Sequence, residues 1–303
     1  MLTRILTAAI SLALFIPLMI FGGVWGACAL FTVVTALSVF EMLECCGLVK
    51  KLYITIPALA LSALVPLGEG IYTWFTYSAR THSDLSATID AFYSATIGGF
   101  MKYAALCLAV ICVVFVATLA YNKVDPEKLF MFFGLAVYIV FGFLSLLKIR
   151  YFVLDDIDKR LSYGLKLFAY VIIIAWGTDT FAYFSGVLFG KKKLCPEISP
   201  KKTVAGAVGG TLLGSAAGAL FILLAGGTDA LCVTLACCAP LLSGVSQFGD
   251  LAASVIKRKF GVKDYGKLFP GHGGVLDRFD SVLSTAVATW LIIRAAAAFG
   301  AVG

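Results

Sequence analysis

Four aspartates lie in or beside apolar segments, and their side chains are the best candidates in the chain for a chemical role. Asp179 lies in WGTDTFAYFSG, Asp250 in SQFGDLAAS, and Asp277 and Asp280 lie in LDRFDS. A carboxylate at the bilayer centre costs about 2.5 to 3.5 kcal/mol on insertion scales, so each needs a partner or a function. Taken alone, each is also an ordinary helix-end carboxylate that caps a helix or pairs with Lys or Arg. Together at one membrane face, they favour a shared role.

The chemistry that these carboxylates favour is the binding of a divalent metal ion. Asp277 and Asp280 are three residues apart and therefore lie on one face of a helix. Mg²⁺ prefers a few carboxylates together with water and phosphate oxygens, and two such ions can clamp a phosphoryl group. We expect Mg²⁺, with Asp250 and Asp277 as its first candidate ligands.

Two basic runs accompany the acids, GKKKLCPEISPKKT at 190–203 and IKRKFGVKDYGK at 256–267. Such runs also arise from membrane topology and from contact with lipid headgroups. The Ser-Pro-Lys-Lys-Thr segment at 199–203 differs, because it directly precedes a predicted helix. A helix N-terminus offers free N–H groups to a phosphate, and the neighbouring lysines add positive charge.

The glycines at 271, 273 and 274 surround His272 and follow Pro270, which predicts a tight loop. Its backbone N–H groups could line an anion site. A lone turn histidine more often makes a local hydrogen bond than it acts in catalysis. We find no Ser-His-Asp or Cys-His arrangement. The sequence therefore favours phosphoryl or nucleotidyl transfer, in which positioning and charge neutralisation do most of the work.

The elements that must position these residues are membrane helices. Only 14% of the residues are charged and the mean hydropathy is +0.98, so lipid is the expected solvent. Unpaired backbone groups are costly in lipid, which leaves helices as the form for long apolar runs. We predict an all-α polytopic integral membrane helical bundle with about nine transmembrane helices. The predicted segments are 5–22, 24–40, 52–68, 104–121, 129–147, 165–186, 204–225, 230–249 and 282–301.

Polarity changes along the chain and predicts two regions. Residues 1–163 are expected to form an N-terminal scaffold of transmembrane helices with few polar residues. Residues 164–303 are expected to form a C-terminal transmembrane catalytic region. The first segment is expected to be a retained helix and not a cleaved signal. Counting Lys and Arg by alternate loops places the N-terminus and the polar segments in the cytoplasm, in a protein of the inner or plasma membrane.

The net charge of +7 suits contact with membrane lipid headgroups or with anionic substrates. Nucleic acid is not expected as a partner, because the chain has no soluble basic domain. The cysteines form no CxxC pairs and are expected to be small packing residues.

A ridge without side chains is predicted from glycines at steps of four residues, Gly206, Gly210, Gly214 and Gly218. Such a ridge lets another helix backbone approach closely. The sequence leaves open whether the partner helix belongs to the same chain or to a second copy in a homodimer.

The run SVIKRKFGVKDYGKLFPGHGGVLDRFDS at 254–281 resembles the signature of phosphatidate cytidylyltransferases, also called CDP-diacylglycerol synthases. WGTDTFAYFSG and SPKKTVAG look like the other two segments of that family, so the resemblance covers about residues 176–281. It implies transfer of CMP from CTP to phosphatidate, giving CDP-diacylglycerol and pyrophosphate. It also implies Mg²⁺ and a second cation whose identity the sequence does not assign.

The resemblance implies roles for particular residues. The ion-binding residues would be Asp250 and Asp277, with Ser254 nearby. The phosphates of CTP and phosphatidate would be bound by Lys201, Lys202, Lys257, Arg258, Lys263 and Arg278. The further catalytic positions are Asp264, His272 and Asp280, and the further substrate-binding positions are Asp179, Ser199, Thr203, Gly271, Gly273 and Gly274.

The sequence departs from the family pattern at three positions. The family commonly has Glu where this chain has Ala205 and Ala253, and Ser or Phe where it has Tyr265. Two alternative functions remain. One is a CTP-dependent kinase of a lipid alcohol such as a polyprenol, in which the γ-phosphoryl group moves. The other is a transporter with an intramembrane Asp as its coupling site, although polar features in only one half of the chain are not typical of inverted repeats.

Overall fold

The structure is a computed structural model that describes residues 2–81, 125–152, 157–268 and 273–299. The chain divides into two compact units, 1–140 and 141–303, and the boundary between them falls inside a long helix. The predicted division at residue 163 separates a scaffold from a catalytic region, and this functional boundary stays a prediction.

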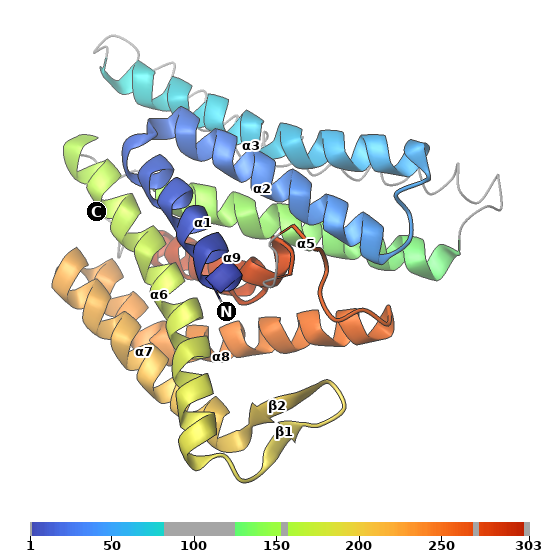
Figure 1. The fold of residues 1–303 in the computed structure, drawn as a ribbon. Coiled ribbons are helices and arrows are strands. Elements are labelled where there is room, and N and C mark those ends of the chain that lie inside the picture. The colour runs from blue at the N-terminus through green and yellow to red at the C-terminus, as the bar shows by residue number, and fades with distance from the viewer. Residues whose placement is uncertain (1, 82–124, 153–156, 269–272, 300–303) are drawn as a thin grey trace. The chain divides into compact units, whose positions relative to one another are not determined.

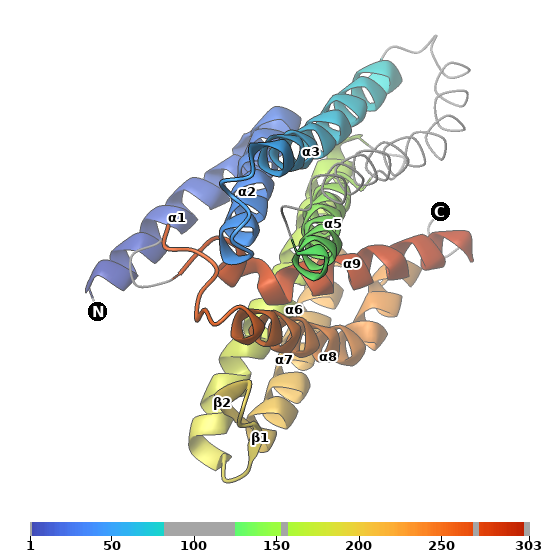
Figure 2. The same cartoon turned by 90° about the vertical axis from the view of Figure 1, so that its right-hand side faces the viewer.

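The first unit consists of apolar helices. It contains α1 (Leu2–Phe21), α2 (Gly23–Cys45), α3 (Leu52–Thr81) and the beginning of α5 (Pro126–Arg150). In Figures 1 and 2, α2 and α3 run side by side. Gly70 makes this approach possible, because a Cβ atom there would lie 2.8 Å from the Cβ of Cys28. Trp25 and Trp74 pack between the same helices with ring centroids 5.9 Å apart.

The second unit carries every aspartate discussed above. After the end of α5 it contains α6 (Ile157–Phe189), β1 (Lys193–Cys195), β2 (Ser199–Thr203), α7 (Val204–Gly226), α8 (Ala230–Lys259) and α9 (Leu276–Ala298). In Figure 1, α6 and α7 lie side by side, with the β1–β2 hairpin joining their lower ends. Helices α8 and α9 complete the unit.

The predicted glycine ridge packs against α6 of the same chain. A Cβ atom on Gly210 would lie 2.7 Å from the Cβ of Ala182 and 2.8 Å from the carbonyl oxygen of Thr178. Gly206 and Gly214 are equally close to α6. The ridge therefore serves intramolecular packing of two membrane helices, which is the small-residue mode of close helix approach.

The described chain is mostly helical, as the sequence predicted, but the prediction missed a short sheet. Lys193 pairs with Thr203 and Cys195 with Ser199 in an antiparallel hairpin. The segment was expected to be a loop leading into a helix. Pro196 and Pro200 disfavour helix here, and the strands can pair because only three residues separate them. Thr203 then caps α7, where its hydroxyl accepts a hydrogen bond from the Gly206 N–H at 3.1 Å.

Seven helices in the described part of the chain are long and apolar enough to cross a membrane. They are α2, α3, α5, α6, α7, α8 and α9, and the predicted segments agree with each of them. In α1 the apolar described part, Ile10–Phe21, is shorter than a span. The predicted segment 104–121 lies outside the described residues. The count of about nine is therefore not confirmed.

Helices α6 and α8 are joined by tyrosines at the end of the unit where α8 begins. Asp229 caps α8 by accepting the Cys232 N–H at 2.8 Å and also accepts the Tyr163 hydroxyl at 2.8 Å. Seven residues further along α6, the buried Tyr170 hydroxyl donates to the carbonyl oxygen of Leu235 at 2.7 Å. These hydrogen bonds satisfy polar groups that would otherwise be costly in an apolar bundle.

The glycine ridge generates a stability prediction with a matched control. Gly210→Ala should destabilise the protein by about 1–3 kcal/mol, because the added methyl group overlaps Ala182 and Thr178. Gly244→Ala is the same change at an exposed helical glycine with nothing within 4 Å, and it should be neutral or slightly stabilising. Thermal unfolding in detergent measures both. Equal effects of the two substitutions would contradict the packing assigned to the ridge.

Candidate functional site

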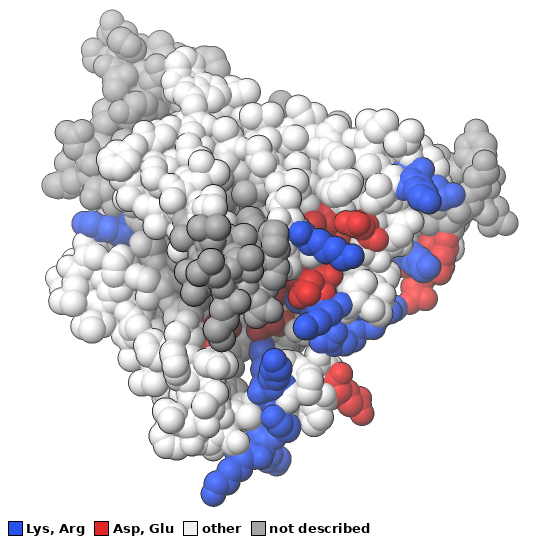
Figure 3. All heavy atoms as spheres, viewed as in Figure 1, with Lys and Arg blue, Asp and Glu red and all other residues white. Residues whose placement is uncertain are grey.

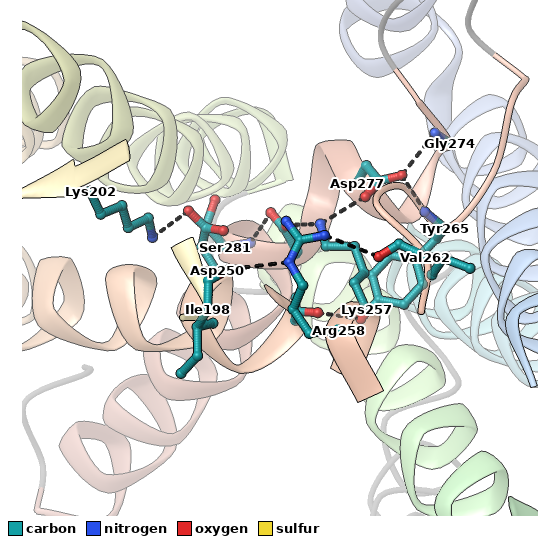
Figure 4. A network of polar contacts seen from close by, with 12 residues as sticks. Ile198, Lys202, Asp250, Lys257, Arg258, Val262, Tyr265, Gly274, Asp277 and Ser281 are labelled. Carbon is teal, nitrogen blue, oxygen red and sulfur yellow. Dashed lines mark hydrogen bonds and ion pairs between the residues drawn. The ribbon is translucent and has the colours of Figure 1, made fainter. Parts of the chain in front are cut away.

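A network of charged and polar side chains joins α6, β2, α8, α9 and the segments 260–268 and 273–275 between α8 and α9 (Figure 4). Helix periodicity creates its two polar faces. On α8, Asp250, Ser254 and Lys257 follow one another at steps of four and three residues. On α9, Asp277 and Ser281 are four apart, with Asp280 beside them. The two faces meet inside the second unit.

Lys257 is the central cation of this network. Its Nζ atom lies 2.8 Å from Asp277 Oδ1 and 3.7 Å from Asp280 Oδ2. The three side chains are largely buried, with exposed fractions of 11% for Lys257, 3% for Asp277 and 12% for Asp280. The ammonium also lies 5.1 Å from the ring centroid of Tyr265. One cation is therefore held between two carboxylates and an aromatic face.

Asp277 also binds the backbone of the loop that precedes α9. Its Oδ2 atom accepts the Tyr265 N–H at 2.8 Å and the Gly274 N–H at 3.0 Å. Gly273 permits the close turn, since its φ of 83° is in the left-handed region and a Cβ atom would lie 2.9 Å from Asp277 Oδ2. Of the loop amides that were expected to line an anion site, the Gly274 N–H donates to Asp277, while Gly271 and His272 lie outside the described residues.

A second ion pair is more open to solvent. Lys202 of β2 lies 2.6 Å from Asp250 of α8, and the two side chains are 27% and 24% exposed. Asp250 is also close enough to Asp179 and Asp280 to interact with them electrostatically. The hairpin thus brings a lysine to the point where three carboxylates come together.

Asp179 reaches this cluster from α6. Its Oδ2 atom accepts the Ser281 hydroxyl of α9 at 2.9 Å. Helices α8 and α9 come very close here, because a Cβ atom on Gly249 would lie 2.8 Å from the Cβ of Ser284 and 3.1 Å from the Asp280 carbonyl oxygen. The structure therefore brings Asp179, Asp250 and Asp280 together from three helices.

The remaining predicted residues lie around this centre. Arg258 donates to the Ile198 carbonyl at 3.3 Å and to the Val262 carbonyl at 3.2 Å, which links the end of α8 to the hairpin turn. Ser199 is half-buried in β2 and Ser254 is half-buried on α8. The exposed residues are Lys201, Lys263, Asp264 and Arg278. The predicted residues Gly271 and His272 lie outside the described residues.

The basic surface near the site is formed largely by the hairpin. Figure 3 shows Lys and Arg side chains gathered over the β1–β2 region, while the visible surface of α7 is uncharged. Lys191, Lys192, Lys193 and Lys201 are all exposed. An anionic ligand approaching Lys202 and Asp250 would meet this positive surface first.

Sequence reasoning missed Ser281 and Tyr265 as members of the network. Ser281 could have been found from its spacing, since it lies one turn after Asp277 on the polar face of α9. Tyr265 was noted only as a departure from a family pattern. No local signal places its hydroxyl, which donates to the Ala253 carbonyl at 2.9 Å across the fold.

The donor set suits Mg²⁺ in its chemistry, since all the candidate ligands are hard oxygen atoms. Within residues 2–81, 125–152, 157–268 and 273–299, no group of three or more His, Cys, Asp or Glu side chains could hold a metal ion by itself. Mg²⁺ usually binds through one or two carboxylates, waters and substrate phosphates, so a complete protein cage is not required. Asp250 is more accessible than Asp277 and Asp280 for such a role.

Comparison with known proteins now adds to this geometry. The profile of the "Cytidylyltransferase family" matches residues 2–296. The chain belongs to the cytidylyltransferase family. The match extends across both structural units, so the helices of the first unit are part of the family architecture.

Individual relatives carry the name phosphatidate cytidylyltransferase. The protein of that name from Brucella abortus is 44% identical over 129 residues, which cover 43% of this chain and 47% of the relative. The one from Bacillus subtilis is 42% identical over 152 residues, covering 47% and 54%. The one from Haemophilus influenzae is 42% identical over 123 residues, covering 40% and 43%. The chain thus spans about half the length of the curated relatives that it matches.

The two ion pairs generate a contrast in stability. Lys257→Met should cost about 3 kcal/mol or more, because it leaves Asp277 and Asp280 buried without their cation. Lys202→Met should change stability by about 1 kcal/mol or less, because that pair is partly exposed and screened. Chemical or thermal unfolding of the two variants measures the difference. Similar losses for both substitutions would contradict the central position given to Lys257.

Proposed function

We propose that the protein is a phosphatidate cytidylyltransferase that transfers CMP from CTP to phosphatidate at the cytoplasmic face of the membrane. The observation that carries this proposal is the meeting of Asp179, Asp250 and Asp280 with Lys202 inside a cytidylyltransferase-family chain. The relatives that bear the name of this activity support it.

The physical problem in this reaction is repulsion between two anions. The phosphate of phosphatidate must approach the α-phosphorus of CTP, and cations must offset the charge that develops. We assign phosphate binding to the accessible basic residues Lys201, Lys202, Arg258, Lys263 and Arg278. Lys257 is only 11% exposed, and we assign it instead to holding Asp277 and Asp280 in place.

The bond changes follow from this arrangement. An oxygen of the lipid phosphate forms a new bond to the α-phosphorus of CTP, and the bond from that phosphorus to the pyrophosphate oxygen breaks. The attacking phosphate is ionised at neutral pH, so no side chain needs to remove a proton. The chain's own residues bind both phosphates and hold the attacking oxygen in line with the bond that breaks.

Mg²⁺ is part of the proposal, with a second cation of unassigned identity. Asp250 and Asp277, with Ser254 nearby, remain the predicted ligands, and Asp280 and Asp179 are close to Asp250. When bound, a divalent ion would neutralise charge on the phosphate oxygens. Asp277 already accepts hydrogen bonds from Lys257, Tyr265 and Gly274, so Asp250 is the better placed of the two predicted ligands.

We further propose that the site faces the cytoplasm, with the N-terminus on the same side. This orientation rests on the Lys and Arg residues of the hairpin and of the end of α8, since positive segments stay in the cytoplasm. A cytoplasmic site would have direct access to CTP. The long apolar helices fit an integral membrane protein of the inner or plasma membrane.

A CTP-dependent lipid-alcohol kinase is the alternative enzyme. An alcohol must lose a proton on attack, so that reaction needs a general base near the metal. Membership in a cytidylyltransferase family favours movement of the CMP group and an enzyme over the transporter alternative.

The reaction class can be decided by isotope position. Purified protein given phosphatidate and CTP labelled at the α-phosphorus should yield a labelled lipid and unlabelled pyrophosphate. CTP labelled at the γ-phosphorus should leave the lipid unlabelled. The γ label in the lipid, with release of CDP, would instead identify a kinase.

The role of Asp250 gives a separate prediction. Asp250→Asn should lower kcat by about 100-fold or more, because it weakens the binding of the divalent ion that would neutralise charge on the reacting phosphates. Stability should change by about 1 kcal/mol or less, since its ion pair is partly exposed. The exposed Asp125→Asn is the matched control and should retain full activity. EDTA should abolish turnover, and added Mg²⁺ should restore it.

A further inference from the structure

We infer that Tyr265 is a positioning residue that holds the Lys257 ammonium on Asp277 and Asp280. The inference rests on the proposed function and deepens it. Tyr265 is 5% exposed and lies in the loop between α8 and α9. Its side chain therefore does not serve as a surface group, and Figure 4 shows it beside Lys257 and Asp277.

Three parts of Tyr265 make three different contacts. The backbone N–H donates to Asp277 Oδ2 at 2.8 Å, and the hydroxyl donates to the Ala253 carbonyl at 2.9 Å. The ring centroid lies 5.1 Å from Lys257 Nζ, within the range of a cation–π interaction. A single residue thus connects α8, α9 and the cation between them.

These contacts hold the Lys257 side chain, which is flexible by itself, in one position. A lysine side chain has a flexible four-carbon stem and a point charge that can pair with any nearby carboxylate. Ala253 lies one helical turn before Lys257 on α8, so the hydroxyl bond sets the ring beside the lysine. The ring then covers one side of the ammonium, and Asp277 and Asp280 meet it on the others.

The position of Lys257 matters for the reaction through Asp280. Asp280 interacts with Lys257 and also with the charges of Asp250 and Asp179. A lysine displaced from Asp280 would change the negative charge that the cluster presents to phosphates. Loss of the ring or the hydroxyl should therefore act on the catalytic step more than on substrate binding.

Kinetics of paired variants test the inference. Tyr265→Phe keeps the ring and the backbone N–H but loses one hydrogen bond, and kcat should fall about fivefold with both KM values within about twofold. Tyr265→Leu also loses the ring, and kcat should fall about 100-fold. The assay uses the full chain with CTP, phosphatidate and Mg²⁺.

Tyr170→Phe is the matched control. It removes another buried phenol that donates to a carbonyl of α8, at Leu235, which lies 18 residues before Ala253 and therefore about 27 Å away along the helix. Tyr170→Phe should lower the thermal midpoint as much as Tyr265→Phe does, while kcat per folded molecule stays unchanged. Unchanged kcat in both variants would show that Tyr265 is merely structural and would overturn the inference.

Lysine acetylation supplies a readout that does not depend on turnover. Brief treatment with acetic anhydride, followed by mass spectrometry, should modify Lys257 about tenfold faster in Tyr265→Leu than in wild type, because the released side chain, once it loses its proton, is an amine that the reagent can reach. Lys202 should react at the same rate in both proteins. Equal labelling of Lys257 overturns the inference alone, whereas wild-type protein that forms no CDP-lipid overturns the proposed function and the inference with it.

Discussion

A carboxylate that folds into a bundle of apolar helices loses its water, and the fold must supply a compensating charge or hydrogen bonds in return. In the second unit this constraint is met by Lys257, which lies between Asp277 and Asp280 while two backbone N–H groups complete the shell of Asp277. Removing one partner of such a buried pair leaves an uncompensated charge, which is far more costly than replacing both. These interactions therefore hold together the end of α8, the start of α9 and the loop residues Tyr265 and Gly274.

The two ion pairs of the site differ in burial, and this difference separates their roles. Lys257 and Asp277 are largely buried, so water screens their attraction only weakly. Lys202 and Asp250 are each about a quarter exposed, and a solvent-screened pair of this kind exchanges partners easily. An incoming phosphate or cation can compete for the open pair without disturbing the closed one. The site thus combines a buried ion pair, Lys257–Asp277, with a partly exposed one, Lys202–Asp250.

Glycines decide how closely the helices that carry these charges can approach. Gly210 lets α7 lie directly on α6, Gly249 lets α8 lie on α9, and Gly273 lets the loop turn tightly around Asp277. In lipid, where helices gain little from hydrophobic burial against one another, such close contact supplies much of the packing energy. The same contacts bring Asp179, Asp250 and Asp280 within electrostatic range of one another.

The sequence by itself determined the membrane class and the position of the long helices, and it showed four aspartates in places where an unpaired carboxylate is costly. These follow from local properties, namely apolar runs of spanning length and the cost of a carboxylate in lipid. Helix periodicity also determined that Asp277 and Asp280 share a face. The resemblance to a cytidylyltransferase signature was confirmed by the family match.

Only the tertiary structure decided which charges pair. Nothing local says that Lys202 pairs with Asp250 in preference to another carboxylate, or that the glycine ridge packs on α6 of its own chain. The hairpin was missed because its pairing depends on two segments separated by a proline turn. The contacts of Tyr265 with Ala253, Lys257 and Asp277 likewise join segments that meet only after folding. Spacing along a helix defines a face, but the partner of that face is set by long-range packing.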